Sequence, residues 1–318
     1  MRVSSSVSDL SPVPVVWAAL APVGLLALAG TGAAVAGVSA ARLRGAPRSA
    51  GALTPVTETV RLLRQRRRVP VAADRLLWQV AVGGLPVVAV LMAVVVPLGP
   101  VVLADVPVGV VWVNAMDVMV WALWWLAGWG PNSAHALIAA HRFLALALAY
   151  ELPLMFALTA PAIAAGSLRL ADVASAQQGL WFVVWMPVAF VVHLVGAVAF
   201  SSWGPFAAAA GADLAGGVLV EASGVDRWLV LAGRHLLLAA AALVAVPLFL
   251  GGGAGPLLGP VLWTVVKALV VLVALELLAG RVPLVRPERF AEVGWVVLLP
   301  ATVLQMLVAA LVAMRGGT

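Results

Sequence analysis

The sequence lacks cysteine and is poor in charged side chains. Its 318 residues contain no cysteine, four histidines, thirteen acidic residues and nineteen basic residues. Without thiols the chain forms no disulfide, no cysteine-bound iron–sulfur cluster and no cysteine nucleophile, and four scattered histidines offer little for zinc. Charged residues make up only 10% of the chain, too few to solvate a water-soluble protein of this size. An ordinary cytosolic enzyme is therefore excluded, and any redox centre is expected on a partner protein.

Long hydrophobic blocks account for most of the chain, which is 64% hydrophobic. About 20 apolar residues suffice for a helix to cross a bilayer. Eight blocks reach this length, at about residues 13–41, 76–97, 108–128, 134–165, 181–201, 228–250, 257–279 and 293–314. Because backbone groups in lipid must be hydrogen-bonded within their own segment, each block is predicted to be a helix. The sequence thus predicts an all-α polytopic membrane protein, with residues 1–318 forming a single membrane domain.

The distribution of arginine predicts the orientation of these helices. The first loop, residues 42–75, carries nine arginines against Glu58 and Asp74, so the positive-inside rule places it in the cytoplasm. Alternation then makes residues 202–227 and 280–292 cytoplasmic and places both termini outside the cell membrane. The net charge of +6 comes mostly from arginines between apolar blocks, which favours anionic lipid headgroups or an acidic protein partner over nucleic acid.

A short amphipathic helix is predicted inside the first cytoplasmic loop. Thr54 followed by Pro55 is typical of an N-cap and first helical position, and apolar residues recur at helical spacing, at Leu53, Val56, Val60 and Leu63. Such a helix lies along the membrane surface. Arg61 and Arg64 are expected to face headgroups or a docked subunit, with a simple topology anchor as the alternative. Residues 66–68, three successive arginines, are expected to face lipid headgroups.

Ionisable residues inside the predicted spans are the main functional candidates, because each costs on the order of 3 kcal/mol near the bilayer centre. They are Asp117, Arg142, Glu151, Arg234 and Lys267. Glu151 lies mid-span, two residues before Pro153, whose ring frees a backbone carbonyl one turn earlier. We expect the helix to open there, so that water from the cytoplasmic side reaches the carboxyl group for proton exchange. A protonated glutamic acid bonded to a neighbouring helix is the alternative.

Spacing predicts which of these groups can meet. Arg142 precedes Glu151 by nine residues, and at about 100° per residue the two point to opposite sides of one helix and cannot pair. Lys267 and Glu276 diverge in the same way. Lys267 is therefore expected to reach a carboxylate on another span, and Glu276 to extend toward the cytoplasmic end.

Two further polar residues are interpreted first as packing residues. Asp117 shares a helix face with Asn114, Trp121 and Trp124, a stripe that favours helix packing over a cofactor site. His193, alone on an apolar helix, is predicted to be a hydrogen-bonded packing residue rather than a ligand. The chain carries no Walker loop, GxGxxG, HExxH or nucleophile elbow, so neither a catalytic residue nor a metal ligand is predicted.

Several stretches resemble the H subunit of bacterial NADH-quinone oxidoreductase (respiratory complex I) and its relatives in membrane-bound hydrogenases. The most specific match is Gly-Trp-Gly-Pro-Asn-Ser at residues 128–133, followed by Arg142 and by Tyr-Glu-Leu-Pro-Leu at residues 150–154. Trp263 with Lys267 also matches a family pattern. The resemblance covers about residues 50–310, and the eight spans of that family agree with the eight predicted above.

This resemblance implies a membrane subunit that anchors a peripheral arm and contributes to a quinone chamber. Quinone is then the substrate, NAD and iron–sulfur clusters lie on partner subunits, and the other partners are lipids. The chain's charged residues at family-like positions imply a proton path, to which Asp117 is added; its members are Glu151, Asp213, Glu221, Lys267, Arg142 and Asp117. The quinone chamber is expected to be flanked by Arg48, Pro205, Phe206 and Arg286, near the glycine-rich residues 211–217.

The loop after the fifth span departs from the family pattern. Residues 200–207 read Phe-Ser-Ser-Trp-Gly-Pro-Phe-Ala, where the family has a sequence close to ETNRAPFD. The Pro-Phe pair is kept, and the family's acidic residues are replaced. Coupling of quinone chemistry to proton movement is therefore left open. The alternatives are a membrane subunit of a hydrogenase-type or antiporter-type complex, and a scaffold subunit that couples nothing.

Overall fold

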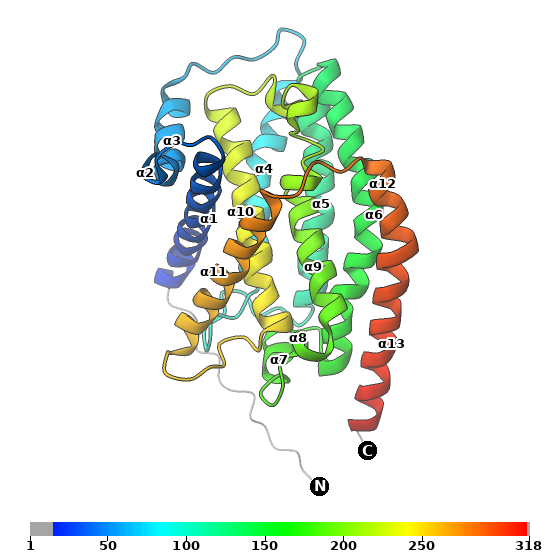
Figure 1. Ribbon diagram of the computed structural model, residues 1–318. Helices are drawn as coiled ribbons and strands as arrows, with labels where there is room; N and C mark the ends of the chain where they lie inside the picture. Colours follow the sequence, from blue (N-terminus) through cyan, green and yellow to red (C-terminus); the bar gives the residue numbers. More distant parts are fainter. Residues whose placement is uncertain (1–14, 317–318) are drawn as a thin grey trace.

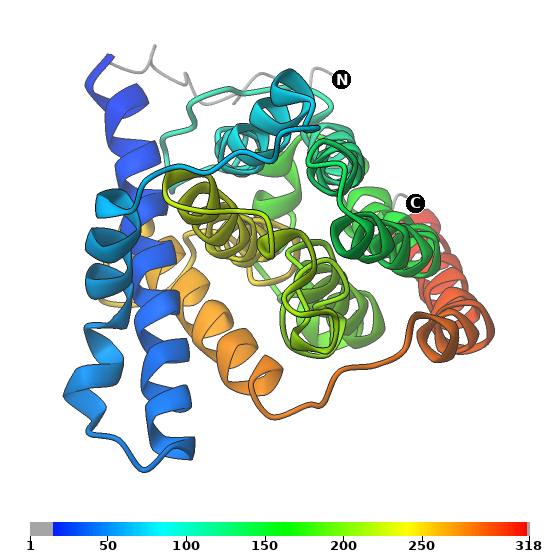
Figure 2. The same cartoon turned by 90° about the horizontal axis from the view of Figure 1, so that it is seen from above.

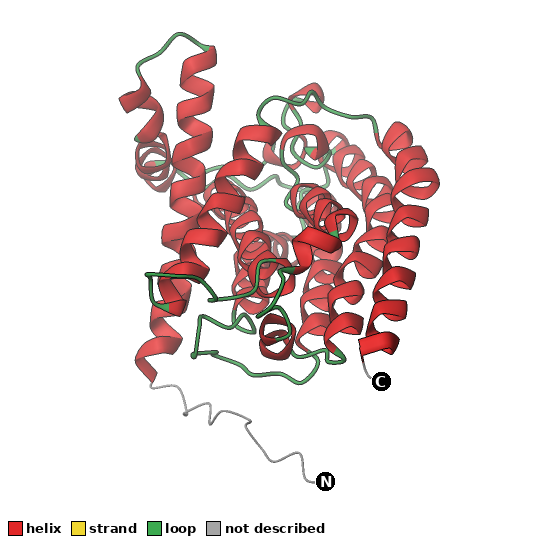
Figure 3. Cartoon of the chain, turned by 60° about the horizontal axis from the view of Figure 1, so that its bottom comes forward, coloured by secondary structure: helices red, strands yellow, loops and turns green. Residues whose placement is uncertain are grey.

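The computed structural model describes residues 15–316, and this part of the chain contains helices and no β-strand (Figure 3). The predicted all-α polytopic membrane fold is confirmed. Residues 13–14, the predicted beginning of the first span, lie outside the described residues. Seven helical segments of the described chain are long and apolar enough to cross a membrane. They are α1 (Val15–Leu43), α4 (Arg75–Ala93), α5 (Gly109–Trp129), α6 (Ala134–Ala165), α10 (Val225–Phe249), α11 (Pro260–Ala279) and a last segment made of α12 (Pro287–Val293), the π-helical turn η4 (Gly294–Leu298) and α13 (Leu299–Gly316).

The predicted fifth span is shorter and interrupted. It consists of α8 (Phe182–Trp185) and α9 (Pro187–Phe200), which are separated at Met186. Met186 has φ −119° and ψ 48°, outside helical geometry, and it precedes a proline. The residue before a proline is disfavoured in helical geometry, and Pro187 has no N–H to continue the ladder. α9 is nevertheless an apolar helix of 14 residues.

The helices stand side by side, and their connections alternate between the two ends of the bundle (Figure 1). The loops predicted to be cytoplasmic lie toward one end, the top in Figure 1, and include α2 (Arg48–Ala52), α3 (Thr54–Arg64), and the short turns η1 (Gly204–Phe206), η2 (Ala212–Leu214) and η3 (Gly217–Leu219). The opposite end carries α7 (Leu170–Ser175) and the beginning of the described part of α1. Which end faces the cytoplasm stays a prediction.

α10 lies at the centre of the bundle, and α1 lies at its edge (Figure 2). In the most apolar stretch of α10, 78% of the residues are buried within the chain, whereas in the corresponding stretch of α1 only 17% are buried. Small residues permit this burial, because backbones approach closely only where side chains are small. At Gly233, for example, a Cβ atom would lie 2.7 Å from the Cβ atom of Leu85 on α4. α1 is held mainly along one side and leaves its other face to lipid.

The amphipathic helix predicted in the first cytoplasmic loop is α3, which begins at Thr54. Its N-cap is Leu53 rather than Thr54, whose hydroxyl donates to the carbonyl of Ala50 at 3.1 Å. The short α2 before it, which the sequence did not predict, already forms that turn. The predicted apolar stripe is exposed, as expected of a helix lying on a membrane, and comprises Leu53, Val56, Val60 and Leu63. Leu62 packs inward instead and is fully buried.

One of the three successive arginines does not face headgroups as predicted. The Nε atom of Arg67 lies 2.7 Å from the Oδ2 atom of Asp226, in the first turn of α10. The indole N–H of Trp78 on α4 donates to the same oxygen at 3.0 Å. The backbone N–H of Arg68 donates to the hydroxyl of Ser223 at 2.8 Å. These bonds tie the loop between α3 and α4 to the beginning of the central helix.

Lys267, the only lysine of the sequence, binds the C-cap of α10 and the loop that follows it. Its ammonium group donates to the carbonyl oxygens of Leu250, Gly252 and Ala254 at 2.7, 2.9 and 2.7 Å, and it lies 4.1 Å from the ring centroid of Trp181. The prediction that Lys267 reaches a carboxylate was wrong. Carbonyls at the end of a helix lack intrahelical partners, and a cation is the group that they bind best in lipid.

We expect Lys267→Met to destabilise the protein, because it leaves these carbonyl oxygens without a donor. Hydrogen bonds to charged groups contribute about 1.5–3 kcal/mol each, so the melting temperature of the purified chain is expected to fall by about 5 °C or more. Intrinsic tryptophan fluorescence during heating in detergent measures the change. Lys267→Arg retains a cation and is expected to lose less. A melting temperature unchanged in Lys267→Met would contradict this role.

The absence of cysteine allows a direct test of the predicted topology. Gln65, directly after α3, and Gln178, shortly after α7, are both exposed, and α3 and α7 lie toward opposite ends of the bundle (Figure 1). We expect a membrane-impermeant maleimide to label Gln65→Cys only in inside-out vesicles and Gln178→Cys only in right-side-out vesicles. The cysteine-free parent chain is the control. Labelling of both variants from one side would overturn the alternation of the spans, and the reverse pattern would overturn the orientation.

Candidate functional site

A pair of carboxyl groups lies buried between α5 and α6. Asp117 is 1% exposed and Glu151 is 8% exposed, and the two side chains interact with one another. Asn114 also interacts with Glu151, and Tyr150 interacts with Asp117. All four carboxyl oxygens are closed to solvent and receive no hydrogen bond from a donor among the described residues. Two negative charges in contact and without donors would repel strongly, so the pair is expected to hold at least one proton.

The polar stripe on α5 divides between packing and this pair. Trp124 packs against Phe143 with ring centroids 5.6 Å apart, which confirms the predicted packing role for this residue of the stripe. Trp121 lies edge-on to Tyr150 at 6.4 Å, beside the two carboxyl groups. The contact between Asp117 and Glu151 was not predicted, because spacing within one helix does not show which residues of another helix it meets.

The predicted water route to Glu151 is closed in this structure. α6 continues as one helix from Ala134 to Ala165, across both Pro153 and Pro161. The expected opening of the helix at Pro153 does not occur, and the carboxyl oxygens of Glu151 are buried. Neighbouring helices enclose this part of α6. Proton exchange with the cytoplasm therefore requires a conformation other than this one.

Arg142 and Asp213 form an ion pair toward the predicted cytoplasmic end. Nη1 of Arg142 lies 2.6 Å from Oδ2 of Asp213, which belongs to η2. The pair is partly exposed, and its arginine points away from Glu151, as the nine-residue spacing predicted. Glu221, another residue of the expected proton path, is half-buried in the turn after η3. The structure thus separates the expected path into a buried pair on α5 and α6 and a partly exposed set at the loop end.

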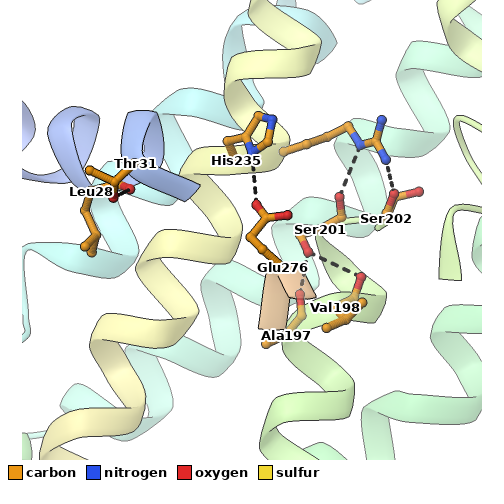
Figure 4. Close-up of polar contacts among 9 residues, drawn as sticks. Leu28, Thr31, Ala197, Val198, Ser201, Ser202, His235 and Glu276 are labelled. Atoms are coloured by element: carbon orange, nitrogen blue, oxygen red, sulfur yellow. Dashed lines mark hydrogen bonds and ion pairs between the residues drawn. The ribbon is translucent and has the colours of Figure 1, made fainter. Parts of the chain in front are cut away.

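A second polar cluster joins α10, α11 and the turn after α9 (Figure 4). His235 lies 3.2 Å from Glu276, which is 4% exposed, so the prediction that Glu276 extends toward the cytoplasmic end was wrong. The guanidinium group of Arg234 donates to the carbonyl oxygens of Ser201 and Ser202 and lies 3.9 Å above the ring of Trp203. The ring of Trp203 also packs on His235, with centroids 4.4 Å apart. These groups come from separate segments, and the sequence did not predict that they meet.

A groove of about 390 Å³ runs between α1, α3 and α10. Most of its lining is apolar and small, with Leu26, Ala29, Gly30, Ala33, Ala36, Gly37 and Ala40 on α1. Its polar lining comprises Arg44, Thr54, Glu58, Thr59 and His235. Trp228 also lines the groove, and its indole N–H donates to the hydroxyl of Thr59 at 3.1 Å. The cluster of His235 and Glu276 borders α1, since a Cβ atom at Gly32 would lie 3.3 Å from Oε1 of Glu276.

The polar end of the groove includes an ion pair on α3. Glu58 binds Arg61, one turn farther along the helix. The hydrogen bond from this guanidinium group holds the pKa of the Glu58 carboxyl below its usual value. Glu58 therefore remains ionised at neutral pH, and Arg61 faces its own helix rather than only headgroups. The groove thus joins an apolar stretch along α1 to a charged rim on the amphipathic helix.

The residues expected to flank a quinone chamber fall into two places. Pro205, Phe206 and Arg286 come together: the backbone N–H of Val285 donates to the carbonyl of Pro205 at 2.8 Å, and the rings of Phe206 and Phe290 lie 4.6 Å apart. Arg48 lies in α2, at the opposite edge of the bundle from α12 (Figures 1 and 2). The groove between α1, α3 and α10 was not predicted, because the small residues of α1 indicated only a membrane-spanning helix and not which helices lie beside it.

Comparison with known proteins places these features in a family. A family model described as NADH dehydrogenase matches residues 15–310. The second H subunit of NADH-quinone oxidoreductase in Geobacter sulfurreducens is 33% identical over 275 residues, which cover 83% of this chain and 84% of the relative. The first H subunit in Geobacter metallireducens is 32% identical over the same shares of both chains. The second H subunit in Cereibacter sphaeroides is 32% identical over 268 residues, 83% of this chain and 84% of the relative.

The match runs through almost all of the helices described above, including the two that carry the buried carboxyl pair. It confirms the resemblance predicted from residues 128–154 and from the other motifs. The chain is a multi-pass membrane protein that belongs to the NADH dehydrogenase family.

Proposed function

We propose that this chain is the membrane subunit of an NADH-quinone oxidoreductase in the cell membrane, where it admits a quinone from the bilayer. The observation that carries the proposal is the groove between α1, α3 and α10. Electrons reach the quinone from partner subunits that hold NAD and iron–sulfur clusters. The loop end of the bundle faces the cytoplasm and binds the peripheral arm of the complex.

The chemistry of the groove fits a quinone with a long apolar tail. A quinone tail needs an apolar passage open to lipid, and its headgroup needs a few placed polar groups. The small side chains of α1 leave the passage, and Arg44, Thr59 and His235 supply hydrogen-bonding groups along it. Glu276 orients the ring of His235, since Nδ1 lies 3.2 Å from its carboxylate. The turn that includes Pro205 and Phe206, with Arg286 near it, is proposed to close the chamber toward the peripheral arm, and Arg48 to border its outer edge.

The proton path is proposed to centre on Asp117 and Glu151. Their carboxyl groups lie in contact inside the bundle, where a shared proton is the least costly state. Arg142 with Asp213, and Glu221 near them, form the cytoplasmic end of this path. Lys267 supports the path from the opposite end by binding the carbonyl of the α10 C-cap and those of the loop after it. Because the pair is closed here, its access to water depends on a rearrangement that quinone chemistry drives.

The turn after α9 favours a second candidate function. In this alternative the chain is a subunit of a hydrogenase-type or antiporter-type complex, or a scaffold subunit that couples nothing. In the turn after α9 the carbonyls of Ser201 and Ser202 bind Arg234, so this turn carries an arginine contact and no carboxyl group. The identity of the subunits that co-purify with the chain separates the candidates. NADH- and flavin-binding subunits support the first proposal, and a nickel hydrogenase pair supports the second.

We expect Ala33→Phe to obstruct the groove, because the new ring occupies the space that Ala33 leaves on α1. The KM for a long-chain quinone is expected to rise by about tenfold, roughly 1.4 kcal/mol of lost binding, with less effect on a short-chain quinone. Quinone reductase assays of the purified complex measure both. Ala34→Phe is the matched control, because Ala34 is the next residue on the same helix and does not line the groove. Equal KM values in the two variants would refute the assignment.

We expect Glu151→Gln to lower proton movement coupled to quinone reduction by at least about tenfold, because an amide cannot exchange the proton that the carboxyl pair holds. Asp117→Asn is expected to have a similar effect, since the two groups interact. Dye quenching in vesicles containing the purified complex measures proton movement. Asp172→Asn, at an exposed carboxylate in α7, is the control. Unchanged proton movement in both core variants would remove the pair from the path.

A further inference from the structure

Packing does not explain why His193, a buried residue of α9, has a second ring nitrogen, Nδ1. It lies on α9, is 2% exposed, and its Nε2 atom is 3.1 Å from the carbonyl oxygen of Ala241 on α10. A carbonyl oxygen only accepts, so Nε2 carries the hydrogen, and Nδ1 of the neutral ring is an acceptor. This confirms the predicted hydrogen-bonded packing residue as far as Nε2 is concerned. Nδ1, however, has no partner in the described part of the chain, and buried polar atoms without a partner are rare.

A small cavity lies between His193 and Asp117. Its volume is about 10 Å³, enough for about one water molecule. Asp117 and His193 are its titratable lining residues, and the others are apolar: Met92, Val113, Leu154, Leu158, Phe200, Ala241 and Val244. The carboxyl oxygens of Asp117 are also buried without a hydrogen-bond donor among the described residues, although this side chain interacts with Glu151 and Tyr150. One water molecule would satisfy both Asp117 and Nδ1 of His193.

We propose that a water molecule in this cavity joins Asp117 to Nδ1 of His193, and that His193 accepts a proton from the carboxyl pair. The inference rests on the proposed function of Asp117 and Glu151 and extends it to a third helix. The carboxylic acid of Asp117 gives its proton to the water, which passes another proton to Nδ1. The products are a carboxylate and an imidazolium ion, so the charge of the cluster is unchanged. The imidazolium keeps its bond to the carbonyl of Ala241.

The place of His193 on α9 supports this role. Phe200 lies two helical turns farther along α9 and lines the same cavity. Of the described α9 residues that line the cavity, His193 is therefore the titratable one. The ring of His193 also packs on Phe249 at 5.7 Å, a contact that would suit a phenylalanine equally well. Packing alone gives no reason for a nitrogen at this place.

Two amide variants separate the two nitrogens of the ring. His193→Gln keeps an N–H donor near the position of Nε2 and removes the acceptor at Nδ1. His193→Asn places an oxygen acceptor near the position of Nδ1 and removes the donor to Ala241. His141→Gln, at an exposed residue of α6, is the control. Infrared spectra of the full chain in lipid vesicles supply the readout, with the C=O stretch of protonated Asp117 assigned by its loss in Asp117→Asn.

We expect the Asp117 band to shift to higher frequency in His193→Gln, because the carboxyl group loses the water that Nδ1 holds. The band is expected to remain near its original frequency in His193→Asn and in the control. In the purified complex, proton movement is expected to fall in both His193 variants, since neither amide accepts the proton. A band that shifts in His193→Asn and not in His193→Gln would reduce His193 to a packing residue and overturn the proposal, as would a band unchanged in both.

The infrared result is independent of proton pumping. If Glu151→Gln leaves pumping unchanged while the Asp117 band still responds to His193→Gln, the proposed function of the pair fails and the hydrogen-bonded link remains. If Glu151→Gln abolishes proton pumping while the frequency of the Asp117 band is unchanged in His193→Gln, only the proposed link to His193 fails. The two proposals therefore stand or fall on different measurements.

Discussion

The cost of an unpaired charge or polar group in lipid constrains this bundle more than any other interaction. The buried ionisable groups of this chain offset that cost in three ways. Lys267 donates to three backbone carbonyls at the C-cap of α10 and in the loop after it, and Arg234 donates to two carbonyls in the turn after α9. Glu276 pairs with a histidine. Asp117 and Glu151 have only one another and a few neighbouring polar side chains, which makes them the pair for which holding a proton is the simplest solution.

The two buried cations have a structural role, whereas the carboxyl pair is the candidate for a functional one. The two cations bind backbone carbonyls where helices end, and they fix the ends of α9 and α10 around the core. The carboxyl pair lies between two long, mostly apolar helices, and within the described part of the chain neither carboxyl group forms an ion pair with a cation. A group that destabilises its surroundings in this way is a better candidate for proton transfer than one whose bonds are complete.

The groove and the cavity beside Asp117 lie along different parts of the central helix. α10 contributes Leu231, Ala232 and His235 to the groove, and farther along the same helix Ala241 and Val244 line the small cavity that Asp117 also lines. His235 belongs to the groove, and Ala241, less than two turns farther along, receives the bond from His193. One rigid helix therefore contacts both the proposed quinone site and the proposed proton site. This shared element is a physical means by which a change at one site can reach the other.

The sequence by itself determined the class of fold, seven of the eight predicted spans and the amphipathic helix, because these depend on the length and polarity of contiguous segments. It also singled out Glu151 and showed that Arg142 cannot pair with it, since both residues lie on one helix of known pitch. The partners of Asp117, Lys267, Glu276 and Arg67 were decided only by the tertiary structure. Each meets a group on another helix or loop, and no periodicity within a segment records which face of a neighbour it will meet. The groove was decided in the same way, by small residues on α1 that leave space only once α3 and α10 stand beside them.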